Sequence, residues 1–71
     1  MADSDAIIHQ IGETAGAVWG ALAEHGPLSL TKLLKVVGQP RDSVLQAVGW
    51  LAREGKINIV EERRNRILSL R

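Results

Sequence analysis

The sequence contains no cysteine, phenylalanine or tyrosine, and its only aromatic residues are Trp19 and Trp50. Without cysteine, neither a disulfide nor a thiolate metal site is available to stabilise a small fold. No apolar run approaches the ~18–20 residues of a membrane-spanning helix, and no basic stretch followed by an apolar segment marks a secretion signal. We therefore expect a cytoplasmic protein without a membrane partner, whose stability rests on its own core or on self-association.

Length and charge set further limits. We expect residues 1–71 to form a single domain, and a domain of this size buries only about 60% of its unfolded surface. The net charge of +1 is well below the strongly basic balance of a dedicated nucleic-acid-binding protein. The charge is uneven, because residues 1–40 carry four acidic and two basic side chains, whereas residues 41–71 carry four acidic and seven basic ones. The C-terminal half is therefore the basic half.

Apolar residues recur every three or four positions in the first third of the chain, at Ile8, Ile11, Ala15, Val18 and Leu22. This spacing predicts a helix over residues 5–25 with these side chains on its buried face. Acidic N-cap candidates precede this helix, and Gly26–Pro27 ends it, because proline disfavours the helical conformation in the residue before it. The next two residues, 28–29, are expected to form a short strand.

Two shorter helices are expected next, over residues 30–37 and 40–54. Ser29 is a suitable N-cap for the first of them, and Gly38 suits the left-handed position that ends it. Pro40 suits the first position of the following helix. The inward side of that helix is expected to hold Val44, Ala47, Val48 and Leu51. Two short helices joined by about three residues that include glycine form a helix-turn-helix.

After Gly55 the apolar period changes from 3.6 to 2. Lys56–Ile59 and part of Arg66–Leu70 alternate polar and apolar residues, which predicts strands over residues 56–61 and 66–70. The polar stretch Glu61–Asn65 predicts the turn between them, with Asn65 as the residue that tolerates a left-handed backbone. The predicted fold is α+β: a winged helix-turn-helix with three helices, a short first strand and a C-terminal hairpin that forms the wing.

Two segments resemble a known family. Ile11–Trp19 (IGETAGAVW) and Ala47–Ile57 (AVGWLAREGKI) are similar to parts of a family of small bacterial and archaeal winged helix-turn-helix proteins of unknown function. The likeness spans nearly the whole chain, and the stretch Gly-Trp-Leu-Ala-Arg-Glu is its most specific part. The resemblance implies the fold and a tendency to self-associate, and it implies no particular biochemical activity.

Candidate DNA-binding residues lie on the third helix and on the wing. In a winged helix the third helix usually enters the major groove, while the wing contacts phosphate or the minor groove. The candidates for contact with double-stranded DNA are Arg41, Ser43, Gln46, Arg53, Arg63, Arg64 and Arg66. Gln46 suits an adenine edge, and the wing arginines suit about two or three phosphates. Against this, Asp42, Glu61 and Glu62 place acidic groups nearby, so these positions can also be read as an ordinary solvated surface.

A second set of residues points to close packing against another protein element. Gly12, Gly16 and Gly20 lie four apart on one side of the first helix, and each costs roughly 0.5–1 kcal/mol relative to alanine. The candidate interface residues are Gly12, Gly16, Trp19, Gly20, Gly49 and Trp50. The approaching element is either another helix of this chain or a second copy in a homodimer; alternatively, Gly12 and Gly20 are merely tolerated on an exposed side. A protein-interaction module that does not bind DNA is therefore the competing hypothesis.

No pattern in the sequence indicates catalysis. His9 and His25 are sixteen residues apart, and no other metal-ligand spacing accompanies them. No nucleophile–base set or phosphate-binding loop is present, and a chain of this size has little room for a substrate pocket. We expect a protein that is not an enzyme and that needs no metal, cofactor or small-molecule substrate.

Overall fold

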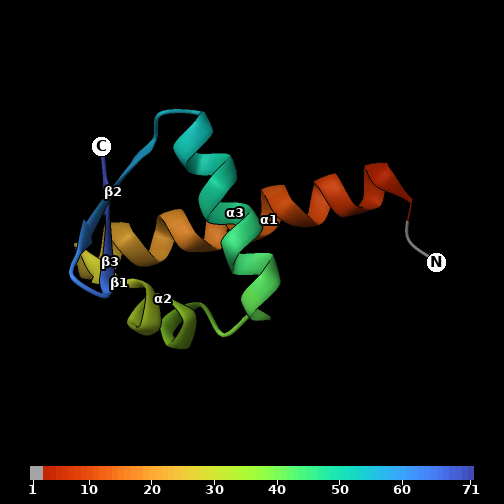
Figure 1. Ribbon diagram of the computed structural model, residues 1–71. Helices are drawn as coiled ribbons and strands as arrows, with labels where there is room; N and C mark the ends of the chain where they lie inside the picture. Colours follow the sequence, from red (N-terminus) through yellow and green to blue (C-terminus); the bar gives the residue numbers. More distant parts are fainter. Residues whose placement is uncertain (1–2) are drawn as a thin grey trace.

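The computed structural model describes residues 3–71, which form three helices and a three-stranded antiparallel sheet (Figure 1). The elements are α1 (Ser4–His25), β1 (Leu28–Ser29), α2 (Leu30–Val37), α3 (Arg41–Arg53), β2 (Ile57–Glu62) and β3 (Asn65–Leu70). The strand order is β1-β3-β2, so β3 lies in the centre of the sheet. This arrangement is the winged helix-turn-helix that the sequence predicts.

Local side-chain chemistry explains where the helices begin and end. Asp3 caps α1 and Ser29 caps α2, each accepting a hydrogen bond from the backbone N–H three residues later, at 2.9 Å and 3.2 Å. Gly38 follows α2 with a φ of 69°, which confirms the predicted left-handed position. Pro40 is the N-cap of α3 and not its first helical residue, and it provides no side-chain cap hydrogen bond. The first backbone amides of α3 therefore have no capping side chain.

The hairpin is tighter than the sequence suggested. β2 and β3 pair in register from Ile57 with Leu70 through to Glu62 with Asn65, so only Arg63 and Arg64 remain for the turn. The prediction that Asn65 takes the left-handed position is wrong, because Asn65 is paired within the sheet. The left-handed residue is Arg63, with a φ of 52°.

The core lies where α3 crosses the C-terminal part of α1 and where the sheet closes against the helices (Figure 1). Its buried apolar residues are Ala15, Val18, Ala21, Leu22, Leu33, Val44, Ala47, Val48, Leu51, Ile57 and Leu68. All four residues predicted for the inward side of the third helix are among them. Apolar side chains from every helix and from two strands thus form one continuous core, which fixes the position of α3 relative to the wing.

The buried stripe predicted for the first helix is wrong at its N-terminal end. Ile8 is 50% exposed, and Ile11 is only partly buried. The reason is visible in Figure 1, where the first turns of α1 extend beyond α3 and no other element lies opposite them. Ile7 is also exposed there. The helical period is correct, but the rest of the described chain covers only the later turns of α1.

Candidate nucleic-acid interface

The outward face of α3 is formed by four exposed residues at helical spacing. Asp42, Gln46, Gly49 and Arg53 follow one another at intervals of four, three and four residues, so they lie on one side of the helix, opposite its buried side. The structure therefore brings Gln46 and Arg53 to the surface predicted for them. Gly49, which the sequence assigned to a protein interface, lies on this same face.

Ser43 does not belong to the outward face of α3. It is partly buried and lines a pocket beside α1, together with Gln10 and Thr14. The structure thus separates Ser43 from Gln46, although the sequence grouped the two as candidates for contact with DNA. The reason is that Ser43 lies on the flank of α3 that packs toward α1.

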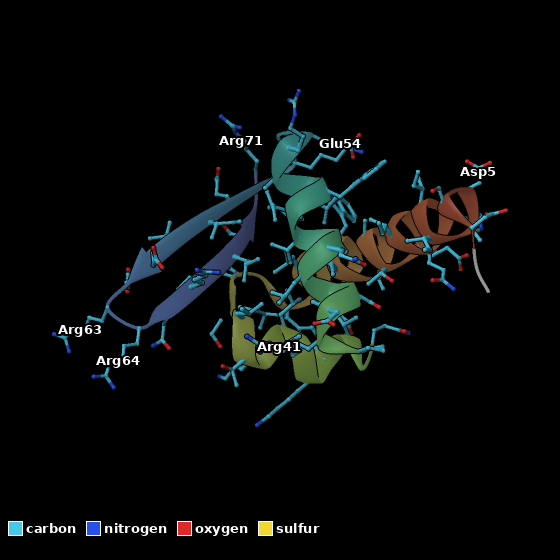
Figure 2. All side chains as sticks on the ribbon, turned by 45° about the vertical axis from the view of Figure 1, so that its right-hand side comes forward. Asp5, Arg41, Glu54, Arg63, Arg64 and Arg71 are labelled. Atoms are coloured by element: carbon cyan, nitrogen blue, oxygen red, sulfur yellow. The ribbon has the colours of Figure 1, made fainter. Side chains whose placement is uncertain are left out.

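A polar cleft of about 350 Å³ lies between the start of α3 and the wing. It is lined by Ser29, Leu30, Thr31, Arg41, Glu61, Arg64, Asn65 and Arg66. Three of the predicted DNA-binding residues, Arg41, Arg64 and Arg66, are thereby brought to one place from two elements that are distant in the sequence. Figure 2 shows Arg41 at the beginning of α3 and Arg64 on the wing.

The charges in this cleft are only partly neutralised. Arg66 Nε lies 3.4 Å from Glu61 Oε1, and the two residues face each other across the hairpin. Within residues 3–71, neither Arg41 nor Arg64 forms an ion pair. The cleft therefore contains two guanidinium groups without a carboxylate partner, and a guanidinium is well suited to bind a phosphate through paired hydrogen bonds.

The tip of the wing holds a strained arginine. Arg63 has a φ of 52°, a conformation that costs an L-residue with a β-carbon roughly 1–2 kcal/mol. Glycine or asparagine is the usual choice at such a position. Figure 2 shows Arg63 and Arg64 projecting from the tip, away from the body of the domain. A residue that is unfavourable for the turn thus places a positive charge at the most protruding point of the hairpin.

We predict that replacing Arg63 by glycine raises the free energy of unfolding by about 1 kcal/mol, because glycine adopts a positive φ without steric penalty. Urea denaturation followed by circular dichroism measures the change. Arg64→Gly is the matched control, since Arg64 lies beside it in the turn and has no positive φ. An Arg63→Gly variant that is no more stable than Arg64→Gly would contradict the explanation.

The cleft continues into an apolar groove of about 270 Å³ along the inner face of the wing. Leu45 of α3 and Ile59 of β2 line this groove, and Glu61 and Arg66 belong to both cavities. Sequence reasoning did not identify Leu45 or Ile59 as surface residues. The alternation of β2 does place Ile59 on the same side as Ile57, but only the structure shows that the core ends before it reaches Ile59, which is 44% exposed.

Another cavity, of about 300 Å³, lies between α1 and the end of α3. It is lined by Gly12, Ala15, Gly16, Trp19, Trp50, Leu51, Glu54 and Lys56. Four of the six predicted interface residues therefore meet in one groove, whereas Gly20 and Gly49 do not line it. Trp19 and Trp50 remain 46% and 41% exposed. We call this cavity the tryptophan groove.

Within residues 3–71, no other element packs closely on the glycines of α1. A β-carbon added at Gly12, Gly16 or Gly20 would meet nothing within 4 Å apart from its neighbours in the same helix. The possibility that another helix of the same chain approaches these glycines closely is therefore wrong. Any element that uses their small size must come from outside the chain.

The described part of the chain offers few other functional features. Within residues 3–71, no group of three or more His, Cys, Asp or Glu side chains is placed to hold a metal ion. His9 Nε2 lies 2.8 Å from Glu13 Oε1 on the exposed surface of α1. None of the helices in these residues is long and apolar enough to cross a membrane.

Comparison with known proteins agrees with this architecture. Residues 5–70 match the family described as a winged helix-turn-helix domain, DUF2582. The chain is also similar to the uncharacterized protein MJ1608 of the archaeon Methanocaldococcus jannaschii. The two are 37% identical over 65 residues, which cover 87% of this chain and 91% of that protein. With three helices, a C-terminal wing and this match over nearly its whole length, the chain belongs to the DUF2582 family of winged helix-turn-helix domains.

Proposed function

We propose that this protein binds double-stranded DNA as a small regulatory or accessory protein and catalyses no reaction. In this proposal α3 enters the major groove with its outward face, and the wing arginines contact phosphates. The observation that carries the proposal is the polar cleft, which Arg41 and Arg64 both line and where neither has a carboxylate partner within residues 3–71. Each of these guanidinium groups can bind a phosphate of the DNA backbone through paired hydrogen bonds.

Two features of the backbone support a phosphate at this place. The first amides of α3 have no capping side chain, and unpaired amides at a helix N-terminus bind anions. The first residues of α2, Leu30 and Thr31, also line the cleft, and they add the partial positive charge of a second helix N-terminus. The strained Arg63 at the wing tip gives further support, because a charged side chain there serves a contact better than it serves the turn.

In the proposed interface, α3 provides selectivity through base contact, and the arginines provide affinity through phosphate contact. Gln46 is the polar side chain on α3 best suited to an adenine edge, and Asp42 on the same face opposes phosphate. With Arg66 held by Glu61, the arginines of the cleft and the wing tip that form no ion pair within residues 3–71 are Arg41, Arg63 and Arg64. We therefore expect about three phosphate contacts per domain and a logarithmic salt slope of about −3.

The proposal is tested by fluorescence anisotropy of a labelled duplex titrated with the protein between about 50 and 200 mM salt. We expect Arg64→Ala to reduce the magnitude of the slope by about one unit, because one phosphate contact is lost. Arg71→Ala is the matched control, since it removes the same charge at the opposite end of the hairpin (Figure 2) and should leave the slope unchanged. Absence of binding at the lowest salt concentration would refute the proposal.

We propose, as a second function, that the protein binds another protein through the tryptophan groove. One specific observation favours it: Trp19 and Trp50 are both about half exposed, beside glycines of α1 on which no other element within residues 3–71 packs closely. Tryptophan is enriched among the residues that dominate binding energy at protein interfaces. This groove is separate from the polar cleft and from the outward face of α3. The two functions therefore do not exclude each other.

A further inference from the structure

We infer that the tryptophan groove binds the projecting first turns of α1 from a second copy of this chain, with the exchange made reciprocally in a two-fold symmetric dimer. The inference deepens the second proposed function by naming its partner, and it is independent of DNA binding. Its elements are the exposed isoleucines at the start of α1 and the groove formed farther along the same helix.

The exposed area agrees with a missing partner of this size. A folded monomer of this mass is expected to expose about 4,300 Å², whereas this chain exposes 5124 Å². The excess is close to the roughly 800 Å² that each partner buries in an interface of standard size. The projecting turns of α1 contribute to it, because Ile7 and Ile8 are exposed there although they are apolar.

The spacing along α1 is self-complementary. Ile8, Gly12 and Trp19 follow at intervals of four and seven residues, so they share one flank of the helix. Ile8 lies six residues before the midpoint between Gly12 and Gly16, about 9 Å along the axis, and Trp19 lies five residues after it, about 7.5 Å. Two antiparallel copies of α1 that cross at this midpoint therefore place Ile8 of each copy beside Trp19 of the other. The glycines at the crossing point allow the two helices to approach closely.

Charge complementarity favours the same arrangement. The first turns of α1 carry Asp3 and Asp5, and α1 contains no lysine or arginine. The groove is lined by Lys56, whose Nζ is only loosely paired with Glu54 Oε1, at 3.9 Å. Asp5 lies on the same flank as Ile8 and Gly12 and projects at the far end of the helix (Figure 2). A second copy thus brings a carboxylate toward the one cation that lines the groove.

A second copy of the chain also accounts for the exposed apolar residues of α1 and of the groove better than an unrelated partner does. A foreign peptide in the groove would cover Trp19 and Trp50 but would leave Ile8 exposed to water. Only an identical chain carries both Ile8 and the groove, and two-fold symmetry covers both surfaces at once. The residues of the outward face of α3 (Asp42, Gln46, Gly49 and Arg53) and those of the wing tip do not line the groove that the second copy occupies.

Light scattering coupled to size-exclusion chromatography tests the inference on the full chain. We expect the wild type to have twice the monomer mass of 7.7 kDa. Ile8→Glu should weaken the dimer by a factor of about 100 or more, because symmetry removes two buried isoleucines and introduces two charges. Val60→Glu is the matched control, since Val60 is also 50% exposed and lies on the wing; it should leave the mass unchanged. Circular dichroism establishes that both variants are folded.

A pair of glycine variants probes the crossing point itself. Gly16→Ala and Gly20→Ala add the same methyl group to α1, and neither clashes within the chain. Only Gly16 lines the groove, so Gly16→Ala should raise the dimer dissociation constant about tenfold, and Gly20→Ala should leave it unchanged. A wild-type chain that stays monomeric at about millimolar concentration overturns the inference. So does a dimer that Ile8→Glu leaves intact and Val60→Glu dissociates.

Discussion

Replacing Leu33 by alanine is expected to leave most of the chain unfolded at physiological temperature. Leu33 is fully buried in α2 and is part of the core shared with α1, α3 and the sheet. Truncating such a leucine costs about 2–5 kcal/mol, because apolar contacts are lost and a cavity remains. A single core in a chain below about 70–80 residues, without disulfide or metal, rarely provides more than 3–5 kcal/mol in total. The loss is therefore comparable with the whole stability.

Thermal unfolding followed by circular dichroism measures this effect. Val36→Ala is the matched control, since Val36 lies in the same helix and is exposed. We expect that variant to change the free energy of unfolding by about 0.5 kcal/mol or less, as surface substitutions usually do. Added duplex DNA should partly restore the fold of Leu33→Ala, because a ligand that binds only the native state stabilises it. Equal melting temperatures for the two variants would show that α2 does not support the core as described.

The second large effect is expected in DNA binding. Exchanging both Arg41 and Arg64 for glutamate should lower the affinity for duplex DNA by a factor of about 60 or more at 0.1 M salt. Each lost phosphate contact accounts for about eightfold at this salt concentration, and the added carboxylates repel the backbone further. Both side chains are exposed and make no ion pair within residues 3–71, so the fold should be retained.

A substitution in the same cleft should act in the opposite direction. Glu61→Gln removes the carboxylate that holds Arg66, and a freed guanidinium adds about one phosphate contact. We expect affinity to rise up to about eightfold at 0.1 M salt, together with a salt slope about one unit steeper. Anisotropy titrations of the three proteins on one duplex provide the comparison. If the double variant binds as tightly as the wild type, the polar cleft is not the phosphate site.

Periodicity was sufficient to predict the fold but not the extent of its core. The helical spacing correctly placed Val18 and Leu22 in the interior, because the helical repeat decides which residues share a face and the core covers that face at these positions. It also placed Ile8 there, which is wrong, since burial requires an opposing element and the sequence does not show where α3 crosses α1. The turn failed for a similar reason: the pairing of Glu62 with Asn65 is decided by sheet register, which outweighs the preference of asparagine for turns.

The candidate sites show the same division between local and long-range information. The sequence identified Arg41 and Arg64 as cationic and exposed, but it contained no sign that they share a cleft, because that depends on the chain folding back through the sheet. Ser43 lies three residues before Gln46, which places it about 60° round the helix, on the flank of α3 that packs toward α1. The sequence did not show that this flank is covered. The sequence predicted that Trp19 and Trp50 belong to a protein interface. Only the structure shows that both line the same groove.

The position of β3 has a consequence for the synthesis of the protein. β3 is the last element in the sequence, yet it is the central strand, and β1 and β2 do not pair with each other. The helices depend on packing against the core, since α2 and α3 have only 8 and 13 residues, and no part of the sheet can assemble until β3 has been made. Leu68, a core residue contributed by β3, is also missing until then. The nascent chain thus exposes an unfinished core until β3 has been translated, and the sheet can join the core only when that strand is available.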